Sequence, residues 1–313
     1  MLPVINKVFK SKEFFLLIFL VALIVIVSIA SPFFLSINNL AFIAQQISEV
    51  GMMSMAMMLV IITGGIDFSL GAIAGFSGVV IGLMLTSGAN IWLAAFSGIL
   101  ASTLCGAFNG YLIGKKNISS LLATLSTSLV FSGIGIVLSK GQPLSDFPTA
   151  YFIFGQGNLG YVPVQFIGFL IITAMLSFIL YYTPWGRKMY LIGENRTAAA
   201  FSGINTDKIL LHAYTIAGLL SGITAVILTS RLSTARADLG NSYMLQSLAA
   251  AVLGGADLKG GRGTIIGAVI GATIFVIINN GLTLLNFPSF MQVLLPGLIL
   301  IVILLINNSA HYS

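Results

Sequence analysis

Residues 184–211 read PWGRKMYLIGENRTAAAFSGINTDKILL, a long stretch that does not fit inside a lipid bilayer. It holds six of the 22 charged residues of the chain, while the sequence on either side is almost entirely apolar. Within it, residues 195–201 predict a short helix with a polar start, a Thr-Ala-Ala-Ala run and Gly203 as the stop signal. We therefore expect a solvated helix between two membrane-bound halves, where a soluble partner can bind.

The composition of the whole chain is that of a membrane protein. Of 313 residues, 58% are hydrophobic and 7% are charged, and the mean hydropathy is +1.06. Soluble proteins carry about 25% charged residues, so a soluble fold is excluded. The net charge of +6 is spread between apolar runs, so the expected partner is the lipid bilayer and not a nucleic acid. We treat residues 1–313 as one transmembrane domain whose main polar loop is 184–211.

Ten apolar runs are candidates for membrane-spanning helices, since a helix needs about 20 apolar residues to cross a bilayer core. They cover 14–31, 40–62, 68–86, 91–113, 119–138, 163–183, 212–230, 242–256, 264–285 and 290–306. The first follows three lysines and lacks a cleavage site, so we interpret it as a retained helix. The predicted fold is an all-α integral membrane protein of about ten transmembrane helices, one or two of them short or broken.

The basic residues predict the orientation, because cytoplasmic loops carry an excess of Lys and Arg. With the N-terminus inside, the inner loops hold Lys7, Lys10, Lys12, Lys115, Lys116, Arg187, Lys188, Arg196 and Lys208. The outer loops hold Lys140, Arg231 and Arg236, while Lys259 and Arg262 lie in a segment of undecided position. Both termini and the loop 184–211 are therefore predicted to be cytoplasmic.

Two Gly-Gly-x-Asp motifs interrupt apolar sequence, and both precede a glycine-rich helix. The motifs are Gly64, Gly65 and Asp67, and Gly254, Gly255 and Asp257. Residues 241–253 span about 20 Å as a helix, which is too short for a core of about 30 Å, so a short or broken helix is predicted. Glycine-interrupted segments in two halves of a membrane protein indicate a transport pathway. We expect the aspartates to accept backbone N–H groups of the turns, and the glycines spaced three or four apart at 71–82 and four apart at 263–271 to allow close packing.

Polar side chains inside the apolar runs are candidates for a translocation path, because they are costly at membrane depth. The candidates are Gln45, Gln46, Glu49, Asn109, Thr124, Asn279 and Asn280. Most are neutral hydrogen-bonding groups, which suit a neutral, hydroxylated solute better than an ion. For each of them, a hydrogen bond that only joins two helices is the alternative interpretation.

Motifs for chemistry of the chain's own are missing. It has no GxxxxGK[ST] loop, no HExxH motif and no catalytic Ser-His-Asp set. Cys105 is the single cysteine, and the two histidines are too far apart for a metal site. We predict no catalytic residue, metal or cofactor in this chain. We also find no paired intramembrane charges of the kind expected in an ion-coupled carrier, so energy for uphill transport would come from another polypeptide docked at 184–211.

Four stretches resemble the permease subunits of bacterial ABC importers, in the group for ribose, xylose, galactose and autoinducer-2. They are ITGGIDFSLGAIAG (62–75), LLATLSTSLVFSGIG with GQP (121–143), GENRTAAAFSGIN (193–205) and AAAVLGGADLKGGRGTIIGAVIGA (249–272). The resemblance covers essentially the whole chain. It implies a multi-pass permease of the inner membrane, paired with a second permease that is an identical or related chain. It also implies a cytoplasmic ATPase that binds the ATP and a periplasmic solute-binding protein.

The resemblance assigns the coupling helix to the segment before the seventh span. The implied ATPase-coupling residues are Glu194, Asn195, Arg196, Thr197, Ala198, Ala199, Ala200, Phe201 and Gly203. The Thr-Ala-Ala-Ala run departs from the acidic-Ala-Ala pattern often found there, so we assign no salt bridge to the ATPase. Arg231, Arg236 and Asp238 are expected to help dock the binding protein on the outer side.

The solute stays open between a ribose-type pentose, a hexose and autoinducer-2. STARADLG (233–240) resembles the autoinducer-2 permeases, whereas NNGLTLL (279–285) resembles the ribose permeases. The alternative function is a secondary carrier for a small polar solute driven by an ion gradient, which predicts uptake by the chain alone. An integral membrane enzyme is a weaker alternative because no catalytic cluster is present.

Overall fold

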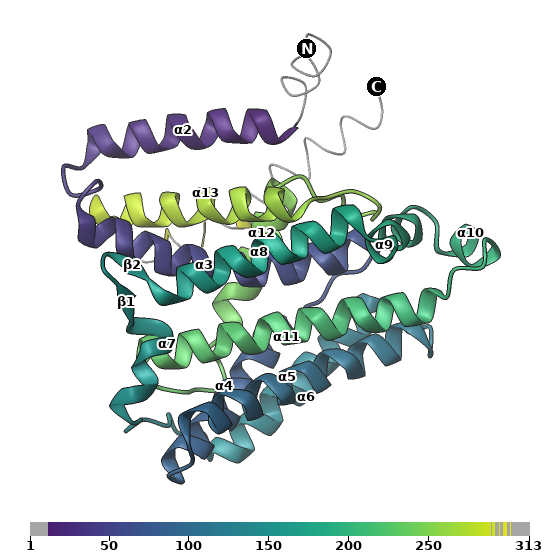
Figure 1. Ribbon diagram of the computed structural model, residues 1–313, viewed down its shortest axis with the longest axis horizontal. Helices are drawn as coiled ribbons and strands as arrows, with labels where there is room; N and C mark the ends of the chain where they lie inside the picture. Colours follow the sequence, from purple (N-terminus) through teal and green to yellow (C-terminus); the bar gives the residue numbers. More distant parts are fainter. Residues whose placement is uncertain (1–11, 289, 292–293, 295–296, 299–300, 302–313) are drawn as a thin grey trace.

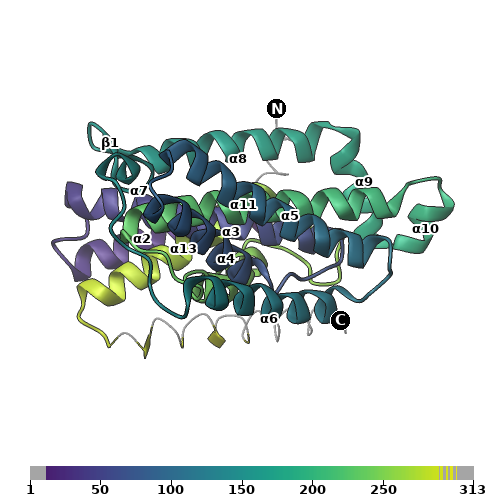
Figure 2. The same cartoon turned by 90° about the horizontal axis from the view of Figure 1, so that it is seen from below.

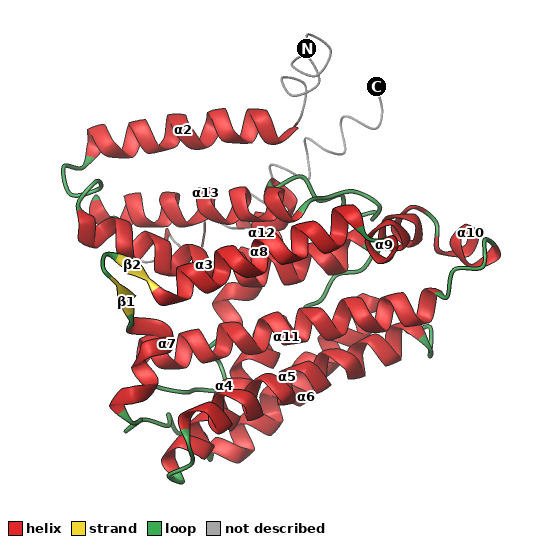
Figure 3. Ribbon diagram, viewed as in Figure 1, coloured by secondary structure: helices red, strands yellow, loops and turns green. Residues whose placement is uncertain are grey.

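The computed structural model describes residues 12–288, 290–291, 294, 297–298 and 301, and this part of the chain is almost entirely helical (Figure 3). Its helices are α2 (Lys12–Ala30), α3 (Ile37–Ile62), α4 (Leu70–Thr86), α5 (Ile91–Gly114), α6 (Ser120–Ser139), α7 (Ile153–Gln156), α8 (Val164–Tyr182), α9 (Pro184–Glu194), α10 (Arg196–Phe201), α11 (Thr206–Leu232), α12 (Asn241–Leu253) and α13 (Ile265–Leu284). A short 3-10 helix (Thr149–Phe152) precedes α7. Strand β1 (Asn158–Leu159) pairs antiparallel with β2 (Val162–Pro163).

The helices agree closely with the predicted apolar runs. Within the described residues, α3, α5, α6, α8, α11 and α13 are long and apolar enough to cross a membrane, and α2 and α4 are shorter apolar helices. The largest difference is at α11, which begins at Thr206 instead of residue 212, because the Asn205 side chain caps it by accepting from Lys208 N at 3.0 Å. The short helix predicted before the second Gly-Gly-x-Asp motif is confirmed as α12, with 13 residues. The predicted span 290–306, including Pro296, lies largely outside the described residues.

The second half of α3 and the length of α11 form the centre of the bundle (Figures 1 and 2). Residues 50–62 of α3 are buried on every side, which explains why their sequence is continuously apolar and not amphipathic. Helix α11 lies along α5, where three glycines spaced four apart (Gly106, Gly110 and Gly114) leave no room for a Cβ against the backbone of α11. Small residues at this spacing allow two helices to approach closely.

The two ends of the bundle differ in character (Figure 1). At one end, called here the α10 end, α9 and α10 extend beyond the spanning helices; α7, β1 and β2 lie at the opposite end, called the hairpin end. The loop 254–264, which carries the undecided Lys259 and Arg262, lies at the α10 end, since Gly261 N donates to the carbonyl of Ile62 at 3.0 Å. These two basic residues therefore share an end with the predicted inner loops.

Two non-helical segments enter the bundle from opposite ends and meet at the start of α4. Segment 63–69 leads from the α10 end into α4, and segment 233–240 leads from the hairpin end into α12. The second segment runs along α4, with Ala235 beside Gly82 and Gly240 beside Gly71. The glycine spacing on α4 therefore accommodates an extended segment, whereas Gly267 and Gly271 pack α13 against the end of α12 and Gly263 lies against α3. The sequence alone could not show that the glycines at 71–82 and those at 263–271 have neighbours of different kinds.

Candidate functional site

The α9–α10 unit is shaped by three capping residues. Thr183 caps α9 by accepting from Gly186 N at 3.3 Å, and Asn195 caps α10 by accepting from Ala198 N at 2.9 Å. Asn195 is extended, with φ −158°, so the chain bends between the two helices. Gly203 follows α10 with φ +79°, a conformation that favours glycine. The short helix predicted over 195–201 is confirmed.

The outer face of α10 is open to a partner. The Phe201 side chain at its tip is 89% exposed, and Thr197, Ala198 and Ala200 are also exposed, while Ala199 packs inward. Both views show α10 at the extreme edge of the described chain (Figures 1 and 2). An aromatic side chain displayed in this way is typical of residues that fill a pocket on a binding partner.

Arg196 points back toward the bundle. Its Nη2 donates to the carbonyl of Gly114 at 2.9 Å and lies 3.4 Å from Asp207 Oδ1. A cation at the C-terminal end of a helix is favourable because it meets unpaired carbonyls. Arg196 thus ties α10 to the end of α5 and to the first turn of α11, and Glu194 and Asn195 remain exposed beside it.

Four glycines from three separate motifs form a tight contact, the glycine junction (Gly64, Gly193, Gly260 and Gly261). A Cβ at Gly193 would overlap the Ile62 carbonyl oxygen and Gly261 N, and a Cβ at Gly260 would lie 2.7 Å from Gly193 O. Gly64, Gly260 and Gly261 have φ of +83°, +92° and +73°. The junction therefore places the end of α9 directly against the turns that follow α3 and α12.

Tyr190 adds a second link between α9 and the loop before α13. Its hydroxyl donates to Gly263 O at 2.7 Å. Burial raises the pKa of Tyr190 to about 12, so the hydroxyl keeps its proton and remains a donor at neutral pH. The carbonyl of Gly263 is consequently fixed to the same helix that carries Gly193.

The aspartates of the two Gly-Gly-x-Asp motifs make the same local bond. Asp67 Oδ1 accepts from Ser69 N at 2.8 Å, and Asp257 Oδ1 accepts from Lys259 N at 3.0 Å. Each carboxylate therefore closes a turn two residues further along the chain. Gly64 and Gly255 both have a positive φ, +83° and +95°, but Gly64 is the first glycine of its motif and Gly255 is the second. The sequence echo therefore corresponds to a repeated carboxylate turn, whereas the left-handed glycine is shifted by one position.

Asn109 and Thr124 hold segment 63–69. Asn109 Nδ2 donates to Ser69 Oγ at 2.7 Å, and Thr124 Oγ1 accepts from Phe68 N at 3.1 Å. Asp67 Oδ2 and Asn109 Oδ1 are buried without a hydrogen bond partner in the described part of the chain. The structure thus brings two predicted path residues together around the turn of the first motif.

Glu49 lies elsewhere, in a buried cluster with Arg231 and Tyr243. Both carboxylate oxygens accept from the Arg231 guanidinium, one of them at 3.0 Å, and Tyr243 OH donates at 3.0 Å. Arg231, expected in an outer loop, belongs to the last turn of α11. The expectation that the spanning helices lack paired charges is therefore wrong. Sequence could not reveal this pair, because its members are 182 positions apart.

The remaining predicted path residues do not join either cluster. Asn280 exchanges two hydrogen bonds with Asn39, at 3.1 and 2.7 Å, which link α13 to the start of α3. Gln45, Gln46 and Asn279 are half-buried. That any of these residues lines a path stays a prediction.

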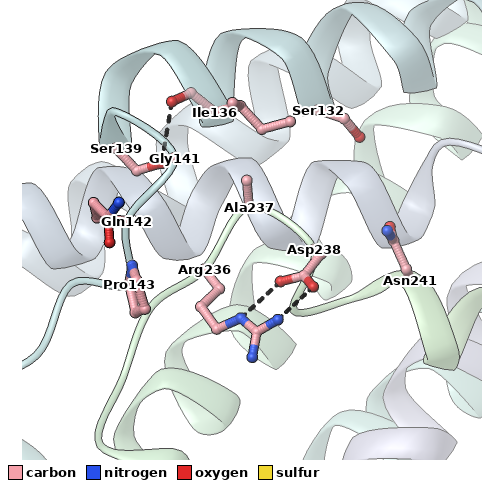
Figure 4. A pocket seen from close by; sticks show the side chains of 10 residues that line it. All are labelled: Ser132, Ile136, Ser139, Gly141, Gln142, Pro143, Arg236, Ala237, Asp238 and Asn241. Carbon is pink, nitrogen blue, oxygen red and sulfur yellow. Dashed lines mark hydrogen bonds and ion pairs between the residues drawn. The ribbon is translucent and has the colours of Figure 1, made fainter.

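Arg236 and Asp238 line a pocket of about 340 Å³ between α6 and segment 233–240 (Figure 4). Its lining residues are Ser132, Ile136, Ser139, Gly141, Gln142, Pro143, Arg236, Ala237, Asp238 and Asn241. Sequence analysis did not single out Ser132 or Asn241. The only signals were indirect, since Ser132 and GQP belong to one of the stretches that carry the family resemblance, and Asn241 follows the STARADLG stretch.

Comparisons with known proteins agree on one family. The family model described as "Branched-chain amino acid transport system / permease component" matches residues 39–304. The chain is 39% identical to the ribose import permease protein of Bacillus subtilis, over 91% of this chain and 89% of that protein. It is 36% identical to the ribose import permease protein of Escherichia coli, over 93% and 92%. It is 32% identical to the autoinducer 2 import system permease protein of Klebsiella pneumoniae, over 96% and 92%. No solved structure matches the chain.

Proposed function

The chain belongs to this family of permease components, and we propose that it forms the path by which an ABC importer carries a neutral sugar or sugar-like solute. As a multi-pass membrane permease it is a transport subunit, and ATP is handled by a separate ATPase. A solute-binding protein is the second partner implied by the family.

The α9–α10 unit is the observation that carries this proposal. Its outer face displays Phe201 and the exposed alanines of α10 to a partner. Its inner face contacts the end of α3 and the loop after α12 through the glycine junction. When the ATPase moves α10, the movement reaches Gly193 through the end of α9. Because Gly193 packs directly against the backbones of Ile62 and Gly261, this movement displaces both of them. Arg196 carries the same movement to α5 and α11.

The finer topology completes the proposal. The chain has ten spans with both termini in the cytoplasm, and the α10 end is the cytoplasmic end. The binding protein docks at the hairpin end, and a second permease, identical or related, completes the path. Among the residues predicted to dock the binding protein, Arg231 is a poor candidate because Glu49 holds it inside the bundle. Arg236 and Asp238 are exposed at the hairpin end, where either the binding protein or a solute can reach them.

The relatives' names and the family's name suggest different solutes. Two relatives are ribose permeases and one is an autoinducer-2 permease, while the family description refers to branched-chain amino acids. A free amino acid would require separate partners for its carboxylate and its ammonium group. The groups named as path residues are mostly neutral donors and acceptors, and Glu49 is already paired. These groups suit a sugar.

Reconstitution tests the coupling. The chain is placed in proteoliposomes with its ATPase and binding protein, and uptake of labelled D-ribose is followed after the sequence of residues 194–203 is scrambled. We expect uptake to fall to background while the folded complex of spanning helices persists. A variant with Lys115 and Lys116 replaced by Gln, which removes exposed charge at the same end, should transport normally. Full ATP-driven uptake by the scrambled variant would show that α10 does not couple.

A further inference from the structure

The pocket between α6 and segment 233–240 has walls of two kinds. One wall is the last turns of α6, which contribute Ser132, Ile136 and Ser139. The other is the extended chain around Arg236, Ala237 and Asp238, which leads to Asn241 at the start of α12 (Figure 4). The pocket thus lies where a helical wall faces a non-helical one.

The extended wall enters deep into the bundle. Ala235 lies beside Gly82 and Gly240 beside Gly71, and 11 residues of α4 correspond to about 16 Å. This is about half of a bilayer core of about 30 Å. Non-helical backbone at such depth is tolerated only where protein covers it or where it lines a water-filled cavity. One side of this segment is covered by α4, and the other side faces the pocket.

The pocket also contains the start of a broken helix. Helix α12 begins at Asn241, and its N-cap residue Gly240 offers no side chain to cap the first turn. Two of the first three N–H groups of α12 are already used, since Asn241 N donates to Asp238 O at 3.0 Å and Tyr243 N donates to Gly240 O at 3.1 Å. In membrane transporters, discontinuous helices near the middle of the bilayer form the solute site, and here the break brings the Asn241 side chain into the lining of the pocket.

The polar side chains of the pocket form an electrically neutral set. The Arg236 guanidinium binds both oxygens of Asp238, at 2.9 and 2.6 Å, and both side chains are about half exposed. Ser132 contributes a hydroxyl and Asn241 an amide to the same lining (Figure 4). The set offers several donors and acceptors at fixed spacing without an unpaired charge.

We propose that this pocket is a solute-binding station on the translocation path, and that it takes a neutral polyhydroxylated molecule of monosaccharide size. This inference rests on the proposed function as a permease. The volume of about 340 Å³ is at the low end for small-molecule sites, which span about 300–1,000 Å³. The Arg236–Asp238 pair and the side-chain amide of Asn241 bind hydroxyl groups on the solute.

The rival interpretation is that Arg236 and Asp238 contact the binding protein. The two interpretations make different predictions for one pair of variants, Arg236→Gln and Asp238→Asn. Each change removes charge-assisted hydrogen bonds to a solute and should lower uptake by about ten- to a hundredfold. Because exposed ion pairs contribute little to folding, both variants should fold. Lys140→Gln, which removes an exposed charge at the same end, is the matched control.

The test uses the complete importer in proteoliposomes, with D-ribose and L-leucine as separate probes. We expect Arg236→Gln and Asp238→Asn to lose ribose uptake while the affinity of the binding protein for the membrane complex stays unchanged, with Lys140→Gln behaving as the wild type. A parallel loss of binding-protein affinity, or normal ribose uptake, would overturn the proposed station. Leucine uptake by the wild type would overturn the solute class. Absence of ATP-driven uptake by the wild type of ribose, of a hexose and of autoinducer-2 would instead contradict the proposed function.

A labelling experiment gives a readout that does not depend on turnover. Cys105→Ala first removes the single native cysteine. Ser132→Cys is then introduced into this variant, so that its only thiol lines the pocket. Millimolar D-ribose should slow modification of this thiol by a charged methanethiosulfonate reagent, and L-leucine should not. Equal modification rates with and without ribose would contradict occupancy of the pocket.

Discussion

Replacing Arg231 with methionine should destabilise the fold more than removing a charge from either of the other ion pairs in the described part of the chain. Glu49 is fully buried, and its partners are Arg231 from α11 and Tyr243 from α12. Methionine keeps the aliphatic bulk of the arginine but leaves the carboxylate uncompensated. The change therefore isolates the charge pair from the packing of the side chain.

The magnitude follows from burial. Removing one member of a buried, hydrogen-bonded ion pair costs about 3–5 kcal/mol, which corresponds to about a hundred- to several-thousandfold in the folding equilibrium. Exposed pairs contribute about 0–1 kcal/mol, and this range applies to Arg236–Asp238 and to Arg196–Asp207. Glu49→Gln should cost less than Arg231→Met, because Arg231 is 18% exposed and can still reach water.

The assay is reversible unfolding of the detergent-solubilised chain in mixed micelles with increasing SDS, followed by circular dichroism. Asp238→Asn serves as the control for an exposed pair. The expected order of destabilisation is Arg231→Met, then Glu49→Gln, then Asp238→Asn, and the double variant Glu49→Gln with Arg231→Met should be more stable than Arg231→Met alone. If Arg231→Met and Asp238→Asn were equally stable, Glu49 would not be a buried, compensated charge.

Three other variants test single contacts. Gly193→Ala should lower ATP-coupled uptake and destabilise the fold by about 1–3 kcal/mol. The control is Gly168→Ala, where an added Cβ meets no atom within 4 Å. Equal stability and uptake of the two variants would contradict the glycine junction. Phe201→Ala should change stability by less than about 0.5 kcal/mol but weaken ATPase binding by about 2 kcal/mol or more in a pull-down titration, and unaltered binding would exclude this side chain from the interface. Thr124→Val leaves Phe68 N without its acceptor and should cost about 1–3 kcal/mol in the same unfolding assay, whereas Thr103→Val, which breaks only a bond to Ile99 O within one helix, should be nearly neutral.

The apolar helices and α10 could be predicted because hydropathy and capping residues are local signals, whereas α9 (Pro184–Glu194), in the polar stretch, was not predicted. Asn195 and Gly203 mark both ends of α10 in the sequence, and the 13-residue length of α12 already excluded a full span. The echo of the Gly-Gly-x-Asp motif likewise predicted repeated turns, because a carboxylate two residues before a free N–H makes a local bond.

The contacts between distant segments could not be predicted in this way. The glycine spacing on α4 indicates close approach of some backbone, but it does not say that the neighbour is the extended segment 233–240. In the sequence, Glu49 is an isolated polar residue in an apolar run and Arg231 is a charge in a predicted outer loop. Their pairing becomes visible only in the structure, where α3 and α11 lie side by side. The contact of Gly193 with Gly64 and Gly261 could not be predicted for the same reason, because it depends on how distant segments pack against one another.

The accumulation of labelled D-ribose in proteoliposomes tests the central claim most directly, with the binding protein outside, the ATPase on the α10 side, and ATP supplied to the ATPase. The account predicts uptake only when the permease, the ATPase, ATP and the binding protein are all present. Uptake by the purified chain alone under a sodium or proton gradient would contradict it and would support the secondary carrier.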